Sequence, residues 1–167
     1  MEAAARPPIV KAGDRRLAAW RSFLRTHTHI LRLLEQDLQS NHKIAIASYD
    51  VLVQLAEAPG NRLRMSELAH AVLLSRSGLT RLVDRLQRDG LVERRPDPDD
   101  ARGLFTVLTD EGRAALRSAT RVHLSGVSTL FIDRLEPDEL AELQRLMTKL
   151  DPDPELAALP DDACGLG

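Results

Sequence analysis

The chain has 167 residues, of which 43% are hydrophobic and 29% are charged. This length is within the range of one domain, and the composition excludes a chain that is disordered along most of its length. The formal net charge of -2 gives no overall sign of a polyanionic partner such as nucleic acid.

The first predicted element is a long amphipathic helix over residues 14–39. A helix of about 25 residues is about 38 Å long at 1.5 Å per residue, which is more than a compact monomer of this size covers. Part of its apolar face is therefore expected to contact another chain. Residues 1–13 before it are expected to form a disordered tail. Apolar residues recur along the helix at spacings of three, four or seven, at Leu17, Trp20, Leu24, Leu31, Leu34 and Leu38.

Three shorter helices are predicted in the next part of the chain. Ser48 is expected to cap the first and Ser66 the second, because a serine hydroxyl accepts a hydrogen bond from a free N–H of the first turn. Ser75 is expected to cap the third, over residues 76–89, with Gly90 at the left-handed position that ends a helix. The last two are thus predicted to meet across a tight turn.

A β-hairpin and two further helices complete the predicted elements. Residues 91–95 and 104–108 are predicted strands, and the polar segment 96–103 between them predicts a long tip. Thr109 is expected to cap a helix over 110–135, and Pro137 to begin a last helix that ends at Leu150. Residues 151–167 are expected to form a flexible tail. The expected fold class is mainly α with a small β-hairpin.

The predicted helix over 76–89 has two faces of different chemistry. On a wheel of 100° per residue, four apolar residues fall within about 60° of one another and predict a core-facing stripe, formed by Leu79, Leu82, Val83 and Leu86. The opposite face carries Ser77, Thr80, Arg81, Asp84 and Arg88, with Arg85 on one flank. Such a face is typical of a helix-turn-helix, whose second helix enters the major groove of DNA, where arginine bonds guanine.

The near-zero net charge conceals an uneven distribution along the chain. Residues 62–95 carry eight basic and four acidic side chains, a net charge of +4, whereas residues 133–162 carry three basic and ten acidic ones, a net charge of -7. The hairpin would then be the wing of a winged helix, with Arg102 at its tip, where narrow minor grooves attract arginine. Asp99 and Asp100 would repel phosphates there, unless Asp100 pairs with Arg102.

Several segments resemble, in order, the signature blocks of the MarR family of bacterial transcription regulators. They are residues 75–86 (SRSGLTRLVDRL), 90–92 (GLV), 100–102 (DAR) and 108–112 (LTDEG). The resemblance covers residues 14–150 and implies a single domain, with a winged helix over 48–108 and dimerisation helices over 14–39 and 110–150. It implies a homodimer on a pseudo-palindromic double-stranded operator, acting as a repressor that a small aromatic or phenolic effector releases.

The resemblance also assigns roles to individual residues. The resemblance implies that Ser75, Ser77, Thr80 and Arg81 contact bases or phosphates in the major groove. It implies further phosphate contacts from Arg76 and Arg85, and a contact of Arg102 with the minor groove. Ala101 stands where many members have Arg or Lys, and Gly78 where many have a residue able to contact a base, so weaker DNA contacts are expected at both. Candidate effector residues combine an apolar body with a polar group and are Trp20, His27, His42, Tyr49 and His123, each of which could equally be an ordinary core or interface residue.

Two classes of function stay open at this point. The first is a DNA-binding regulator, which the basic segment and Arg102 favour; the second is a winged-helix module that binds a protein partner or sequesters a small molecule. An enzyme is disfavoured, because no Ser/His/Asp order, Gly-rich phosphate loop or metal-ligand spacing occurs, and no cofactor or metal is expected. The single cysteine, Cys164, predicts a reducing, cytoplasmic location and is a poor redox sensor. No apolar run is long enough for a membrane span.

Overall fold

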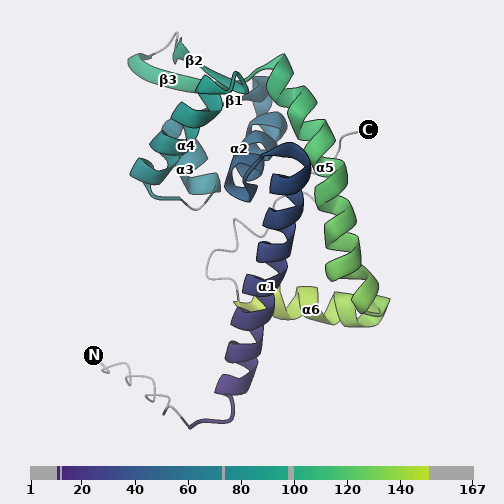
Figure 1. Ribbon diagram of the computed structural model, residues 1–167. Coiled ribbons are helices and arrows are strands. Elements are labelled where there is room, and N and C mark those ends of the chain that lie inside the picture. Colours follow the sequence, from purple (N-terminus) through teal and green to yellow (C-terminus); the bar gives the residue numbers. More distant parts are fainter. Residues whose placement is uncertain (1–10, 12, 73, 98–99, 151–167) are drawn as a thin grey trace, which may run out of the picture.

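The computed structural model describes residues 11, 13–72, 74–97 and 100–150, without the side chains of residues 100–102. Figure 1 shows a compact unit of short helices and a small sheet at one end of the molecule. Two long helices, α1 (Leu17–His42) and α5 (Asp110–Leu130), run from this unit to the last helix, α6 (Pro137–Leu150), which lies beside α1 at the other end. The predicted tails lie outside the described residues, apart from Lys11 and Gly13.

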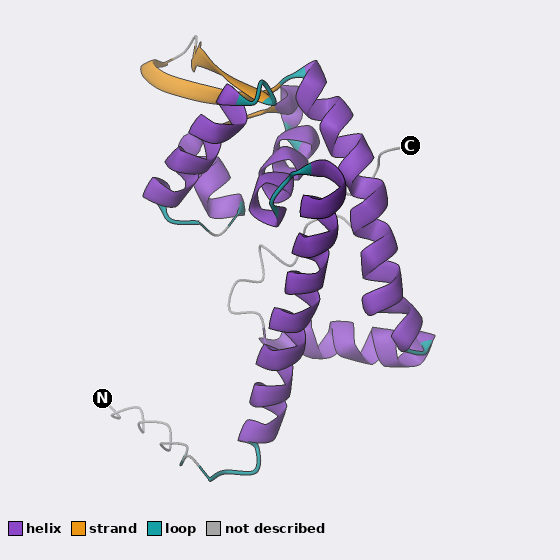
Figure 2. Cartoon of the chain, in the orientation of Figure 1, coloured by secondary structure: helices purple, strands orange, loops and turns teal. Residues whose placement is uncertain are grey.

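The long helices α1 and α5 pack against each other beside the winged-helix unit and diverge towards α6 (Figure 2). Helix α1 begins and ends three residues later than predicted, and Lys43 ends it with a left-handed φ of 58°. Gly126 allows the close approach, because a Cβ at this position would lie 2.6 Å from Leu34 Cδ2 of α1. Helix α5 is capped as predicted, since Thr109 Oγ1 accepts a hydrogen bond from the Gly112 N–H at 2.9 Å, but it ends at Leu130, before the 3₁₀ turn η2 (Ile132–Arg134).

The predicted caps of the next two helices are wrong. Helix α2 (Ile46–Glu57) begins before Ser48, which is buried inside it, and the Ile46 N–H donates to Glu35 Oε2 of α1 at 2.6 Å. A carboxylate from a neighbouring helix therefore replaces the local serine. Helix α3 (Met65–Ala71) likewise begins before Ser66. The carboxylate of Glu67, within the helix, accepts a hydrogen bond from the Arg64 backbone N–H at 2.8 Å.

Helix α4 (Arg76–Arg88) follows α3 across a short turn, as predicted. Ser75 is its N-cap, and the serine Oγ accepts a hydrogen bond from the Gly78 N–H at 3.2 Å. Gly90 follows the helix with a φ of 74°, which glycine adopts without the clash that a Cβ would cause. Helices α3 and α4 thus form the predicted helix-turn-helix.

The wing is longer and more regular than its composition predicted. Strands β2 (Val92–Asp97) and β3 (Asp100–Leu108) pair antiparallel, so the prediction of a long tip over 96–103 is wrong. Pro96 is tolerated because β2 is an edge strand of the sheet, whose order is β1-β3-β2. The unpredicted strand β1 (Arg62–Arg64), after the 3₁₀ turn η1 (Pro59–Asn61), pairs with the other edge of β3.

One apolar core joins α1, α2, α3, α4 and α5 beneath the sheet. Its largest fully buried side chains are Leu38, Leu52, Leu55, Leu68, Leu79, Leu86 and Leu116. The predicted stripe of α4 is part of this core, so the opposite face of α4 points outward. The fold is therefore a winged helix-turn-helix with long helices at both ends of the chain, as expected.

Candidate nucleic-acid interface

Helix α4 presents a polar and mostly basic face to solvent. Leu79, Leu82, Val83 and Leu86 are buried, each at most 5% exposed, and this fixes the rotation of the helix about its axis. Six of the predicted DNA-contacting residues lie on or directly before this helix and are exposed, namely Ser75, Arg76, Ser77, Thr80, Arg81 and Arg85. The structure thus brings them to one surface.

The predicted DNA-contacting side chains of α4 make only local contacts that DNA could replace. Thr80 Oγ1 donates to the Arg76 carbonyl at 2.9 Å, and Arg81 Nε donates to the Ser77 carbonyl at 3.3 Å, which leaves the terminal nitrogens of Arg81 available. Within the described part of the chain, Arg76 and Arg85 have no hydrogen-bonded or ion-paired side-chain partner. Their charges are therefore not neutralised locally.

Two grooves flank α4 and both contain arginine. A groove of about 340 Å³ lies between the start of α3 and α4, where Arg76 and Thr80 face Ser66. A second groove, of about 380 Å³, lies on the other side of α4 and is lined by Arg81, Arg85 and Arg88. A phosphate group in either groove would meet at least one guanidinium group.

The acidic residue on this face, Asp84, is paired. Arg94 of β2 donates from Nη2 to Asp84 Oδ1 at 2.6 Å and from Nη1 to Gln87 Oε1 at 3.0 Å. The sequence pattern placed Asp84 on the exposed face but did not identify its partner, because Arg94 lies ten residues away on a strand. The periodicity of a helix carries no signal for such a contact.

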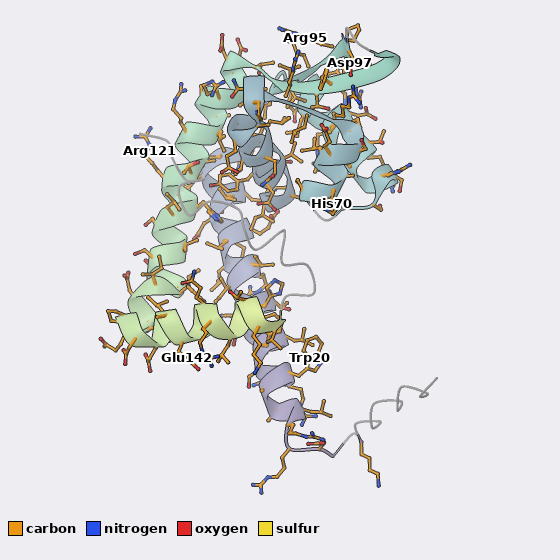
Figure 3. The ribbon with its side chains drawn as sticks, turned by 180° about the vertical axis from the view of Figure 1, so that it is seen from behind. Trp20, His70, Arg95, Asp97, Arg121 and Glu142 are labelled. Carbon is orange, nitrogen blue, oxygen red and sulfur yellow. The ribbon has the colours of Figure 1, made fainter. Side chains whose placement is uncertain are left out.

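The tip end of the wing contains a second ion pair. Arg64 of β1 contacts the carboxylate of Asp97, whose side chain is only 1% exposed at the end of β2. The guanidinium groups of Arg62 and Arg64 also lie over the ring of Phe105, at 4.6 and 5.7 Å from its centroid. Figure 3 shows Asp97 and Arg95 at the sheet end of the molecule. The side chain of Arg102 lies outside the described part, so its minor-groove contact and its pairing with Asp100 stay predictions.

The five candidate effector residues fall into separate places. Tyr49 and His123 come together between α2 and α5, with ring centroids 4.6 Å apart, and the Tyr49 hydroxyl lies 3.5 Å from Thr120 Oγ1. His123 Nδ1 and His42 Nε2 are buried without a hydrogen-bond partner among the described residues, and burial lowers the pKa of His123. Trp20 lies far from this site, near α6 (Figure 3).

A different surface surrounds Trp20 and His27. Trp20, Phe23 and His27 stack along one side of α1, with successive ring centroids 6.0 and 5.9 Å apart. An apolar groove of about 670 Å³ between α1 and α6 includes His27. Large hydrophobic side chains of both helices remain exposed around it, among them Trp20, Leu24, Leu31, Leu146, Met147 and Leu150.

The described residues contain neither a metal-binding cluster nor a membrane-spanning helix. No group of three or more His, Cys, Asp or Glu residues within them could hold a metal ion. No helix in the described part is both long and apolar enough to cross a membrane.

Known proteins are similar to this chain in sequence and in fold. A sequence model of the MarR family matches residues 42–103, from the end of α1 into the wing. An uncharacterized HTH-type transcriptional regulator of Bacillus cereus is 31% identical over 141 residues, which cover 79% of this chain and 92% of the relative. The HTH-type transcriptional repressor YetL of Bacillus subtilis is 35% identical over 82 residues, 49% of each chain. Sco3205 of Streptomyces coelicolor, a MarR family transcriptional regulator solved in complex with DNA, superposes with a TM-score of 0.81 and 33% identity, over 95% of this chain and 96% of its own. This chain therefore belongs to the MarR family of transcriptional regulators.

Proposed function

We propose that the protein is a homodimeric transcriptional repressor that binds one specific operator through α4 and the wing. The observation that carries this proposal is the exposed face of α4, where polar and basic side chains lie opposite a fully buried stripe. In the major groove, Ser77, Thr80 and Arg81 would contact base edges. Phosphate contacts would come from the N-terminus of α4 at Ser75 and from two arginines beside the grooves, Arg76 and Arg85, while Arg102 would enter the minor groove.

Two features favour DNA over a protein partner for this face. The unpaired arginines of α4 give it a local positive charge, which suits the phosphate backbone. The relative Sco3205, which matches almost the whole chain, was solved with DNA, and YetL is named a repressor. Because chromosomal DNA would be its ligand, we place the protein in the cytoplasm.

A second copy of the chain would cover the apolar surface of α1 and α6. Trp20 is 55% exposed, Leu31 39% and Leu150 72% in the single chain, and contiguous apolar patches of this kind mark interfaces. A dimer would also present two α4 helices to the two halves of a pseudo-palindromic operator. The long helices would therefore serve as dimerisation elements, and residues 14–150 as one domain.

For a small effector we propose a site at the Tyr49–His123 contact. It lies where α2 of the winged helix meets α5, so a ligand there would touch both the DNA-binding unit and a dimerisation helix. The buried Nδ1 of His123 has no hydrogen-bond partner among the described residues and could bond the hydroxyl or carboxylate of a phenolic acid. Trp20 and His27 would instead belong to the dimer interface.

The experiment that tests the DNA-binding proposal selects bound fragments from genomic DNA and then compares the selected sequence with a scrambled one of equal length. Arg81→Ala should weaken operator binding by about 5- to 150-fold, because a bidentate contact with guanine is worth about 1–3 kcal/mol. Arg121→Ala is the matched control, since Arg121 projects from α5 on the side away from α4 (Figure 3). Equal binding of both DNAs by the wild-type protein would overturn the proposal and favour a module that binds a protein or a small molecule.

A further inference from the structure

A side chain of the wing is bonded to the helix that we propose reads DNA. Arg94 lies on β2, opposite the buried Thr106 of β3. Its guanidinium group uses two nitrogens to bond Asp84 and Gln87, which are three residues apart and so neighbours on one side of α4. The group therefore spans one turn of α4 and ties that turn to the strand. A contact with two partners on α4 restrains the helix more than a single bond would.

The acidic member of this pair stands where a carboxylate opposes DNA binding. Asp84 shares the exposed face of α4 with Thr80 and Arg81, and a free carboxylate there would repel phosphates. Its charge is cancelled by Arg94, whose side chain is only 26% exposed, so solvent screens the pair less than a fully exposed one. The pair thus adds no net charge to the surface, and what it adds is a fixed geometry.

From this arrangement we infer that Asp84 and Arg94 are positioning residues, which set the placement of the wing relative to α4 without touching the DNA. The inference rests on the proposed function. A winged helix places its helix and its wing in neighbouring grooves, so their relative placement must match the operator. A connection made before binding reduces the ordering that binding requires. This connection favours the operator complex, in which both α4 and the wing contact their grooves, over non-specific complexes that form mainly through phosphate contacts.

The test measures the ratio of the affinity for the selected operator to the affinity for scrambled DNA. Asp84→Ala removes a negative charge and Arg94→Gln removes a positive one. If only electrostatics mattered, Asp84→Ala would strengthen binding to operator and scrambled DNA alike, and Arg94→Gln would weaken binding to both, so the ratio would stay the same. Positioning predicts instead that both variants lower the ratio, by about threefold or more, since coupled side chains interact by about 0.5–3 kcal/mol. The exchanged pair, Asp84→Arg with Arg94→Glu, should restore most of the ratio.

A neighbouring ion pair provides the matched control. Arg95 contacts Glu93 on the same strand, and both side chains are more than 40% exposed, so this pair connects no two elements. Glu93→Ala and Arg95→Gln make the same charge changes and should leave the ratio unchanged. Thermal unfolding of every variant should stay near wild type, because exposed pairs contribute at most about 1 kcal/mol.

The outcomes separate this inference from the proposed function. An unchanged ratio in Asp84→Ala and Arg94→Gln, or a lowered ratio that the exchanged pair does not restore, would overturn the positioning role while leaving DNA binding by α4 intact. A wild-type protein that does not distinguish operator from scrambled DNA would overturn the proposed function itself.

Discussion

Replacing Gly112 by alanine should destabilise the junction between the wing and α5. A Cβ on Gly112 would lie 2.0 Å from the Leu91 carbonyl oxygen and 2.8 Å from Leu108 Cδ1, and real Cβ atoms essentially never come within 3.0 Å of such atoms. The Leu91 carbonyl is held in place because it accepts the Thr109 N–H at 3.2 Å, while Thr109 Oγ1 donates to the Gly90 carbonyl at 2.7 Å. The start of α5 must therefore move by about 1 Å, and overpacking of this kind is itself destabilising.

The expected loss of stability is about 2 kcal/mol. Overpacking against backbone costs about 1–3 kcal/mol, and disturbing the Thr109 cap costs about 1 kcal/mol more. The higher helix propensity of alanine than of glycine stabilises the folded state by at most about 1 kcal/mol. For a domain of this size the midpoint of thermal unfolding should fall by about 4–8 °C, measured by circular dichroism at one fixed protein concentration because dimerisation shifts the midpoint.

Gly126→Ala in the same helix is the control for this substitution. Its new Cβ would lie 2.6 Å from Leu34 Cδ2, the end of a flexible side chain that can move, rather than from backbone. The free energy of unfolding should therefore change by less than about 1 kcal/mol, because the gain in helix propensity offsets the repacking. If the Gly112→Ala and Gly126→Ala variants have the same free energy of unfolding, the close contact between Gly112 and the Leu91 carbonyl does not position α5.

Three further predictions concern the dimer, the pH dependence of stability and the ion pair near the tip of the wing. Leu31→Asp should convert the dimer to a monomer in light scattering, whereas Leu104→Asp, on the wing and similarly exposed, should not. Because burial lowers the pKa of His123, the unfolded chain takes up its proton first as pH falls below about 6.5, so stability falls by at most about 1.4 kcal/mol per pH unit. His123→Phe should lose this part of the pH dependence between pH 7.5 and 5.5; an unchanged dependence would contradict the assignment. Arg64→Gln should cost about 2 kcal/mol in denaturant unfolding, since it removes an arginine that bonds the buried Asp97 carboxylate, and a cost below about 1 kcal/mol would show that the pair is dispensable.

The parts of the fold that the sequence predicted well depend on local signals. The extent of α4 follows from an apolar stripe, a serine before it and a glycine after it, all within sixteen residues. The start of α5 follows in the same way from Thr109. Six of the seven predicted DNA-contacting residues are exposed together because one helix carries them or begins beside them, and the period of that helix alone decides which side chains face outward.

The errors come from contacts that join distant parts of the chain. Serine was expected to cap α2, but Glu35 from α1 supplies the acceptor, eleven residues earlier. Strand β1 has only three residues, and it pairs because β3 presents a free edge, which no local pattern signals. The long tip was expected because residues 96–103 are polar, yet Asp97 is polar and buried, paired with an arginine 33 residues away.

These ion pairs also change how the charge of the chain bears on its affinity for DNA. A sum over residues 62–95 counts Arg94 and Arg95 as basic, although each is paired with a carboxylate in the structure. A paired arginine releases few counterions when DNA binds, so it contributes little to the salt dependence of binding. That dependence should instead follow the unpaired arginines of α4. Arg85→Ala should reduce the slope of log affinity against log salt by about 0.9, whereas Arg95→Gln should leave it unchanged, and equal effects of the two would show that overall charge, rather than local pairing, governs the interaction.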